Sequence, residues 1–117
     1  MRILIVVPLS AMLAGCALNW RGSTPHSTIA SSKQPSDIAS CLVNALDAGW
    51  ERRRTLPWDT VQHHVRTIDP GKVFEVAPIN DLGDDFIRVT GLPEGGSKIE
   101  VAGPRWRFFD GEIRGCA

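Results

Sequence analysis

The 117-residue sequence predicts an α+β domain, in which one N-terminal amphipathic helix packs on an antiparallel meander of four to six short strands. Three observations predict this fold class. Apolar residues recur at helical spacing from about residue 36, short segments of alternating apolarity follow, and tight-turn sequences separate these segments. The length suits one small domain, which is expected to span residues 36–117.

The first 15 residues are expected to be a targeting segment rather than part of the fold. Arg2 supplies a positive charge, and residues 3–13 form an uncharged apolar stretch. A helix of that length rises about 16 Å, roughly half the thickness of a hydrocarbon core. The segment is therefore too short for a stable transmembrane helix and is typical of a secretory signal.

The residues that follow, Leu13-Ala14-Gly15-Cys16, resemble the lipobox of bacterial lipoproteins. The resemblance covers residues 1–16 and implies that the signal peptide is cut before Cys16, whose thiol carries diacylglycerol and whose new amine is acylated. Several acyl chains anchor a protein stably, whereas one chain alone binds only marginally. In that family an aspartate after the cysteine favours the inner membrane. Ala17 stands at this position, so the resemblance implies the outer membrane of a Gram-negative cell, with the protein facing the periplasm.

Residues 16–35 are predicted to be the lipidated cysteine and a flexible tether. This segment is rich in Ser, Thr and Pro and has no sustained apolar period. A flexible chain of about 19 residues has a root-mean-square reach of roughly 25 Å, which would lift the domain clear of the lipid headgroups.

The helix is predicted to begin near Ser36, with Ser36 or Asp37 as the N-cap. One continuous stripe follows at helical spacing: Ile38, Cys41, Leu42, Ala45, Leu46, Gly49 and Trp50. Residues 51–54 end the helix with three arginines, where the macrodipole favours positive charge. A sheet or another helix must cover the apolar stripe.

Six strand segments are predicted after the helix: residues 60–68, 72–79, 86–92, 97–102, 105–109 and 112–116. Sequences rich in Asp, Pro and Gly separate them. Asp110-Gly111 indicates a hairpin between the last two.

The sequence has three cysteines, so one thiol is expected to differ from the other two. With Cys16 assigned to lipid, Cys41 and Cys116 remain in an oxidising compartment, which favours a disulfide between them. The bond would join the helix to the end of the chain. One difficulty is that strict alternation from Ile113 points Cys116 away from the helix, unless a bulge near Gly115 shifts the register.

No catalytic residue, metal site or cofactor is predicted. His63 and His64 are adjacent on a strand and point to opposite faces, so they do not easily share one metal ion. Cys41 with His63 and Asp59 would resemble a nucleophile with its base. However, a cysteine on an apolar stripe is better explained by a disulfide.

Basic and aromatic residues alternate from Arg105 to Phe109. On a strand, Trp106 and Phe108 would share one face, and Arg105, Arg107 and Phe109 the other. Two interpretations stay open. In the first, one aromatic pair fills the core and the arginines lie in solvent. In the second, Arg105, Arg107 and Phe109 bind a periplasmic protein or an anionic envelope polymer, since interfaces are enriched in arginine and aromatic residues.

A net charge of zero, from 13 basic and 13 acidic residues, gives no electrostatic indication of nucleic-acid binding. These observations favour a non-enzymatic binding, accessory or envelope-structural module on the outer membrane. The alternative is a small periplasmic hydrolase that acts on envelope material. A pocket joining His63 to a carboxylate would favour the hydrolase, and a convex surface with arginine and phenylalanine would favour binding.

Overall fold

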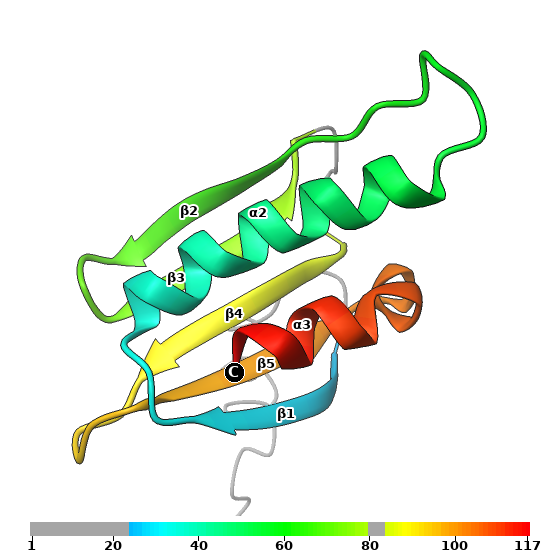
Figure 1. The fold of residues 1–117 in the computed structure, drawn as a ribbon. Coiled ribbons are helices and arrows are strands. Elements are labelled where there is room, and N and C mark those ends of the chain that lie inside the picture. The colour runs from blue at the N-terminus through cyan, green and yellow to red at the C-terminus, as the bar shows by residue number, and fades with distance from the viewer. Residues whose placement is uncertain (1–23, 80–83) are drawn as a thin grey trace, which may run out of the picture.

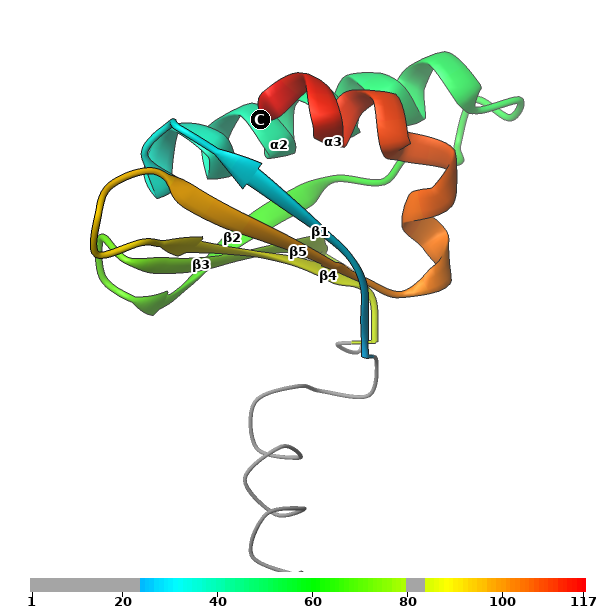
Figure 2. The same ribbon diagram turned by 90° about the horizontal axis from the view of Figure 1, so that it is seen from below.

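The computed structural model describes residues 24–79 and 84–117. The described residues form five strands and two α-helices, which confirms the α+β class. In chain order the elements are β1 (Pro25–Ser31), α2 (Pro35–Arg53), β2 (His63–Asp69), β3 (Val73–Pro78), β4 (Phe86–Gly91), β5 (Ser97–Ala102), the 3-10 helix η1 (Pro104–Phe109) and α3 (Asp110–Cys116). The strands form one antiparallel sheet with the order β1-β5-β4-β3-β2, and α2 and α3 lie side by side over one of its faces (Figures 1 and 2). The predicted signal peptide and Cys16 lie outside the described residues.

The segment predicted as a flexible tether contributes the edge strand β1. It pairs with β5 from Pro25 opposite Ala102 to Ser31 opposite Ser97. Half-buried and exposed residues alternate along it, and Ile29 packs against the main core. Because Ile29 is the only large apolar residue of this strand, the alternation is hard to recognise in the sequence. The sheet therefore includes residues 25–31 of the predicted tether, and the helix follows this strand instead of preceding the sheet.

The predicted amphipathic helix is confirmed as α2, although its N-cap is Gln34 rather than Ser36 or Asp37. Pro35 occupies the first turn, where its missing N–H would have had no partner within the helix. Leu42 and Leu46 are fully buried against the sheet. The apolar stripe of α2 is therefore covered by the sheet, as the sequence predicts.

Strands β2 to β5 lie close to their predicted positions. Val76 on β3 is opposite Ile87 on β4, and Val89 on β4 is opposite Ile99 on β5, so these apolar residues line the face beneath the helices. The main core also includes residues from all of the helical segments: Ile38, Ala39, Leu42, Leu46, Trp106, Phe109, Ile113 and Cys116. One apolar sheet face covered by helices is the expected arrangement for an antiparallel sheet of this size.

The other face of the sheet carries a row of alternating charges. Glu75 lies between Arg88, at 2.7 Å, and Arg66, at 3.4 Å, and its side chain is only 1% exposed. Arg88 is in turn opposite Glu100 on β5. Opposite charges on neighbouring strands stabilise the pairing. This row of charges therefore helps to fix the strand register from the polar face of the sheet, as the apolar pairs do from the face beneath the helices.

The predicted hairpin of residues 105–109 and 112–116 is wrong, because these residues form η1 and α3. Trp106, Phe109, Ile113 and Cys116 are all buried. Their spacing of three, four and three residues is helical rather than alternating. Since Ile113 and Cys116 share one helix face, Cys116 points toward α2 without a bulge at Gly115.

The predicted Cys41–Cys116 disulfide is present, with a Cα–Cα distance of 5.7 Å. It joins α2 to the last residue of α3. The C-terminus is also tied to the end of β1, because the Ser31 hydroxyl donates to the Ala117 carbonyl at 2.9 Å. Within the described residues, no helix combines the length and apolarity needed to cross a membrane.

Candidate functional site

Aromatic and arginine side chains gather at one end of the domain. Here α2 leads into the loop of residues 54–62, and β5 leads into η1. In Figure 1 this loop and η1 lie on the same side of the domain. We call this region the aromatic–arginine end, defined by Trp50, Arg53, Arg54, Trp58, Arg105, Arg107, Phe108 and Phe109.

A mainly apolar cavity of about 280 Å³ lies within this end. It is lined by Trp50, Arg53, Arg54, Thr55, Asp59, Phe108 and Phe109. Phe109 belongs to the core and is 2% exposed, and the Trp50 ring stacks on it at 6.3 Å with an interplanar angle of 12°. Phe108 is 67% exposed. The cavity thus combines an aromatic wall that packs on the core with an aromatic side chain that is open to solvent.

Three arginines lie over the aromatic rings of this end. The guanidinium carbon of Arg105 is 4.8 Å from the Trp50 ring centroid, and that of Arg53 is 4.8 Å from the Phe109 centroid. Arg107 lies 6.0 Å from the centroid of Phe108. Such stacking stabilises a guanidinium while leaving its edge able to donate hydrogen bonds. The cavity is therefore flanked by positive groups in defined positions.

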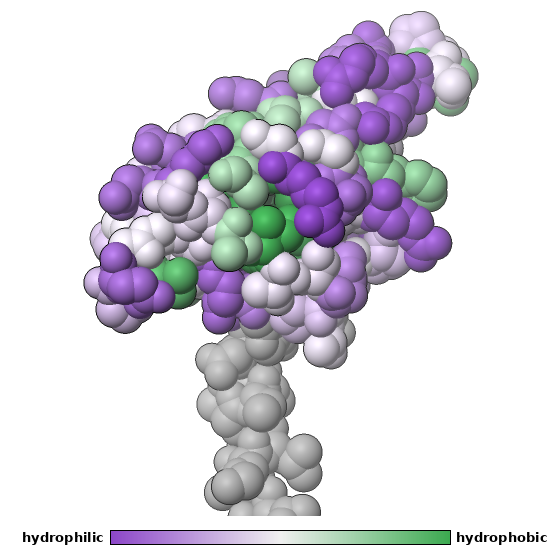
Figure 3. Space-filling model, turned by 60° about the horizontal axis from the view of Figure 1, so that its bottom comes forward, coloured by the Kyte–Doolittle hydropathy of each residue, from purple (hydrophilic) through white to green (hydrophobic). Residues whose placement is uncertain are grey.

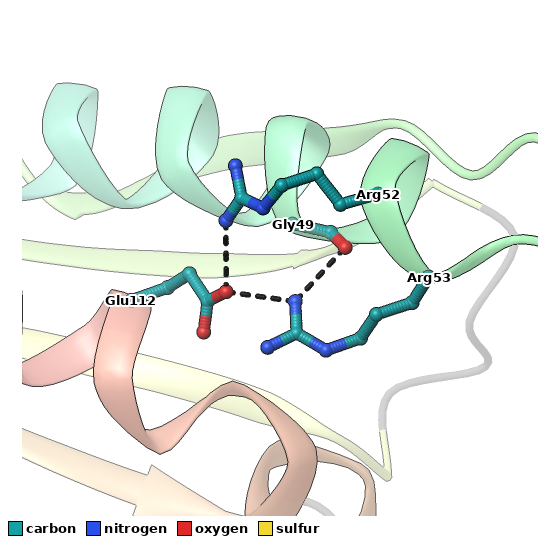
Figure 4. A network of polar contacts seen from close by, with 4 residues as sticks. All are labelled: Gly49, Arg52, Arg53 and Glu112. Atoms are coloured by element: carbon teal, nitrogen blue, oxygen red, sulfur yellow. Dashed lines mark hydrogen bonds and ion pairs between the residues drawn. The ribbon is translucent and has the colours of Figure 1, made fainter.

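A network of ion pairs holds α3 against the end of α2 (Figure 4). One carboxylate oxygen of Glu112 accepts hydrogen bonds from Arg53 at 2.7 Å and from Arg52 at 3.0 Å. The same Arg53 nitrogen also donates to the Gly49 carbonyl at 2.9 Å. The hydrogen bond from Arg53 is the main reason that the pKa of Glu112 lies below its usual value. This network orients Arg53 at the wall of the cavity.

Two contacts hold the loop after α2 against the helix, and a third lies within the loop. The Trp50 indole nitrogen donates to the Asp59 carbonyl at 2.8 Å, while Arg54 pairs with Glu51 at 2.8 Å and donates to the Pro57 carbonyl. The loop nevertheless leaves large apolar side chains in solvent. Trp58 is 76% exposed. Thr55 and Asp59 of the same loop line the cavity, and an exposed tryptophan in such a loop is typical of a contact surface.

The predicted partner-binding set of Arg105, Arg107 and Phe109 does not form one exposed face. Arg107 is exposed and Arg105 is half-buried, but Phe109 lies in the core, so its assignment to the surface is wrong. The exposed aromatic residue is Phe108. The helical course of η1 is the reason, because it replaces the two-residue alternation of a strand.

The sequence did not indicate that residues 50–58 lie beside η1. They are about 50 residues away along the chain, and they come together only because α2 ends where β5 ends. Trp58 in a polar, proline-containing loop was the available signal, since an exposed tryptophan there has no core to fill.

His63 and Asp47 form a hydrogen-bonded pair at the start of β2. One oxygen of Asp47 accepts from the His63 backbone N–H at 2.8 Å and from ring nitrogen Nδ1 at 2.7 Å. Burial lowers the pKa of His63 and outweighs the opposing effect of Asp47. The His63 side chain is fully buried and lies 5.9 Å from the Trp106 ring. The pair fastens β2 to α2.

The nucleophile arrangement of Cys41, His63 and Asp59 is not assembled. Cys41 is in the disulfide, and the carboxylate that pairs with His63 is Asp47. Among residues 24–79 and 84–117, no three His, Cys, Asp or Glu side chains are grouped so that they could hold a metal ion. Comparisons with protein-family models, curated proteins and solved structures give no match to this chain.

Proposed function

We propose that this chain is a lipoprotein that is anchored through Cys16 in the outer membrane and faces the periplasm. There it acts as a non-enzymatic binding or accessory module through the aromatic–arginine end. One observation carries the binding proposal: an apolar cavity is lined by the exposed Phe108, by the stacked Trp50 and Phe109 rings, and by Arg53, which lies over Phe109. Tryptophan and arginine are the residues most enriched at the energetic centres of interfaces.

The shape and chemistry of the cavity suggest what it binds. A volume of about 280 Å³ lies just below the range of roughly 300–1,000 Å³ for small-molecule sites, and it suits one apolar side chain, ring or short acyl segment. Arg53 and Arg54 of the lining already pair with carboxylates, whereas the exposed Arg107, which stacks on Phe108, favours an anionic group next to that apolar one. The contact surface is therefore suited to a partner that presents apolar and negatively charged groups together.

Two features support the envelope location. The Leu13-Ala14-Gly15-Cys16 motif supports the lipid anchor, and the Cys41–Cys116 disulfide is typical of an oxidising compartment such as the periplasm. The disulfide also leaves Cys16 as the one cysteine outside the pair.

The His63–Asp47 pair is the observation that favours the alternative, a small periplasmic hydrolase acting on envelope material. A general base must reach the proton that it removes, either directly or through one water molecule. The side chain of His63 is 0% exposed, and it does not line the cavity of the aromatic–arginine end. Its burial supports a structural role for the pair and therefore the binding module.

The anchor can be tested in cells that produce the wild type or Cys16→Ser. We expect palmitate to label the wild type in the outer-membrane fraction, and we expect the variant to be unlabelled and released to the periplasm. A wild type that takes up no label would contradict the anchor.

The binding surface can be tested by photo-crosslinking. A photoreactive residue at position 108 is expected to crosslink to a partner, whereas one at position 94, which is exposed in the turn between β4 and β5, is not. Equal crosslinking from both positions would contradict a specific role for the aromatic–arginine end.

A further inference from the structure

The position of β1 shortens the link between the anchor and the domain. This inference rests on the proposed lipid at Cys16. Because β1 begins at Pro25, only residues 17–24 separate the anchor from the sheet. Eight residues span at most about 29 Å when fully extended, and their root-mean-square reach as a flexible chain is roughly 16 Å. The end of the sheet at which β1 begins is therefore held close to the lipid surface.

The chain enters the sheet beside the aromatic–arginine end. Pro25 pairs with Ala102, the last residue of β5, which leads into η1. Thr24 and His26 share a cavity of about 420 Å³ with Arg107, and a ring nitrogen of His26 lies 2.8 Å from the Gly103 carbonyl. The first residue of β1 and the start of η1 thus lie at the same end of the sheet (Figure 1).

Exposed apolar side chains are concentrated at this end. The described part of the chain exposes six large ones. Four of them, Leu56, Trp58, Ile79 and Phe108, belong to segments that join elements here, while Val65 and Ile68 lie on β2. The turn between β4 and β5, at the other end, exposes Pro93, Glu94 and Gly95. In Figure 3, apolar surface next to hydrophilic surface is visible on the side where η1 lies in Figure 1.

These side chains match the chemistry of a membrane interface. Tryptophan and phenylalanine partition favourably to the headgroup level of a bilayer, and arginine donates hydrogen bonds to lipid phosphates. The anchor adds a high effective concentration of lipid at this surface, so a weak intrinsic affinity is enough for docking.

We propose that the aromatic–arginine end docks on the phospholipid surface that holds the anchor. Trp58 and Phe108 lie in the interfacial zone, and arginines such as Arg107 face the lipid phosphates. The turn between β4 and β5 then projects into the periplasm. The competing occupant of this end is a periplasmic protein, and a protein-free experiment separates the two.

The test uses the full lipidated chain in vesicles of phosphatidylcholine and phosphatidylglycerol. An environment-sensitive fluorophore is attached in separate variants at Trp58→Cys, Phe108→Cys and, as the matched control, Glu94→Cys. All three positions are exposed, so the substitutions leave the core intact. Lipids with a nitroxide near the headgroup are expected to quench positions 58 and 108 several-fold more than position 94. Equal quenching at the three positions would overturn the proposal and leave a protein as the occupant.

A second experiment distinguishes docking of the aromatic–arginine end from the closeness to the membrane that a short spacer imposes on the domain. An insertion of about 20 Gly and Ser residues after Ala17 raises the reach of the spacer to roughly 29 Å. Stronger quenching at position 108 than at position 94 is expected to persist, and its loss would overturn the proposal. Mass spectrometry of the same preparation reports the lipid at Cys16. A missing lipid would refute the anchor itself, whereas a lipidated chain without differential quenching would refute only the docking.

Discussion

Removal of the Cys41–Cys116 disulfide should destabilise the domain more than most single changes can. The bond closes a loop with a sequence separation of 75 residues and joins α2 to the end of α3. In the chain-entropy model, a loop of this length restricts the unfolded chain by about 4.5 kcal/mol at 25 °C. Small domains have unfolding free energies of about 5–15 kcal/mol, so this one bond contributes a large fraction of the total.

The structure also indicates where the loss should appear first. α3 has seven residues, which is too short for an isolated helix to be stable in water. Its position depends on burial of Ile113 and Cys116, on the Glu112 network and on the disulfide. Hydrogen exchange in Cys41→Ala/Cys116→Ala should therefore accelerate most over α3.

Urea unfolding followed by circular dichroism measures the magnitude. We expect Cys41→Ala/Cys116→Ala to lower the free energy of unfolding by about 3–5 kcal/mol, with a larger m-value because the unfolded chain expands. Ser40→Ala, at an exposed position on α2, is the control and should stay within about 0.5 kcal/mol of the wild type. A loss below about 1 kcal/mol in the double variant would contradict a major contribution of the disulfide to stability.

Three further predictions concern the ion-pair network, pH and backbone conformation. Glu112→Gln should lower the free energy of unfolding by about 1 kcal/mol, and no more, because its arginine partners are exposed to solvent. Asp110→Asn breaks a pair in which both side chains are exposed, and it should change the free energy of unfolding little in the same urea titration. Burial lowers the pKa of His63 from its ordinary 6.5, so proton binding favours the unfolded chain. Unfolding titrations at several pH values should therefore show that the free energy of unfolding falls progressively below pH 6.5. His63→Gln should flatten this pH dependence, and an unchanged dependence would contradict its assignment to His63. The pKa of Glu112 is also lowered, from 4.5, so its contribution is present above that pH and lost below it. Gly103→Ala should lower the free energy of unfolding by on the order of 1–3 kcal/mol, because Gly103 has a φ of 104° and a Cβ would collide with a neighbouring aspartate. Gly111→Ala, where a Cβ meets open space in α3, should be neutral or stabilising by up to about 1 kcal/mol. Similar losses of stability for both variants in thermal unfolding would contradict this explanation.

The central part of the fold could be predicted from the sequence because its patterns are strong. The stripe that includes Ile38, Leu42 and Leu46 repeats at helical spacing over three turns, and the strands β2 to β5 are bounded by turns rich in Asp, Pro and Gly. The disulfide also followed from the sequence, since assigning Cys16 to lipid left one pair of cysteines.

The two ends of the domain could not be predicted, for different physical reasons. β1 is stabilised by its backbone pairing with β5 and by one apolar residue, Ile29, so its sequence carries little apolar alternation. In η1 and α3, the buried residues Trp106, Phe109 and Ile113 are spaced for helices, but Asp110-Gly111 is also a strong hairpin signal. Tertiary packing on α2 decides between these alternatives.

The same ambiguity explains why the predicted binding residues differ from those that the structure exposes. Reading residues 105–109 as a strand placed Phe109 on the surface, whereas the helical course buries it and exposes Phe108. The other residues of the cavity, such as Trp50 and Arg54 at the C-terminal end of α2, come from a distant part of the sequence and meet η1 only in the folded domain.

Intact-mass spectrometry of the protein extracted from membranes tests the lipid anchor and the disulfide together. We expect a chain that begins at Cys16, carries the mass of diacylglycerol and an amine-linked acyl chain, and lacks two hydrogens because Cys41 and Cys116 are bonded. A chain that retains residues 1–15 and carries no lipid would contradict the proposed anchor.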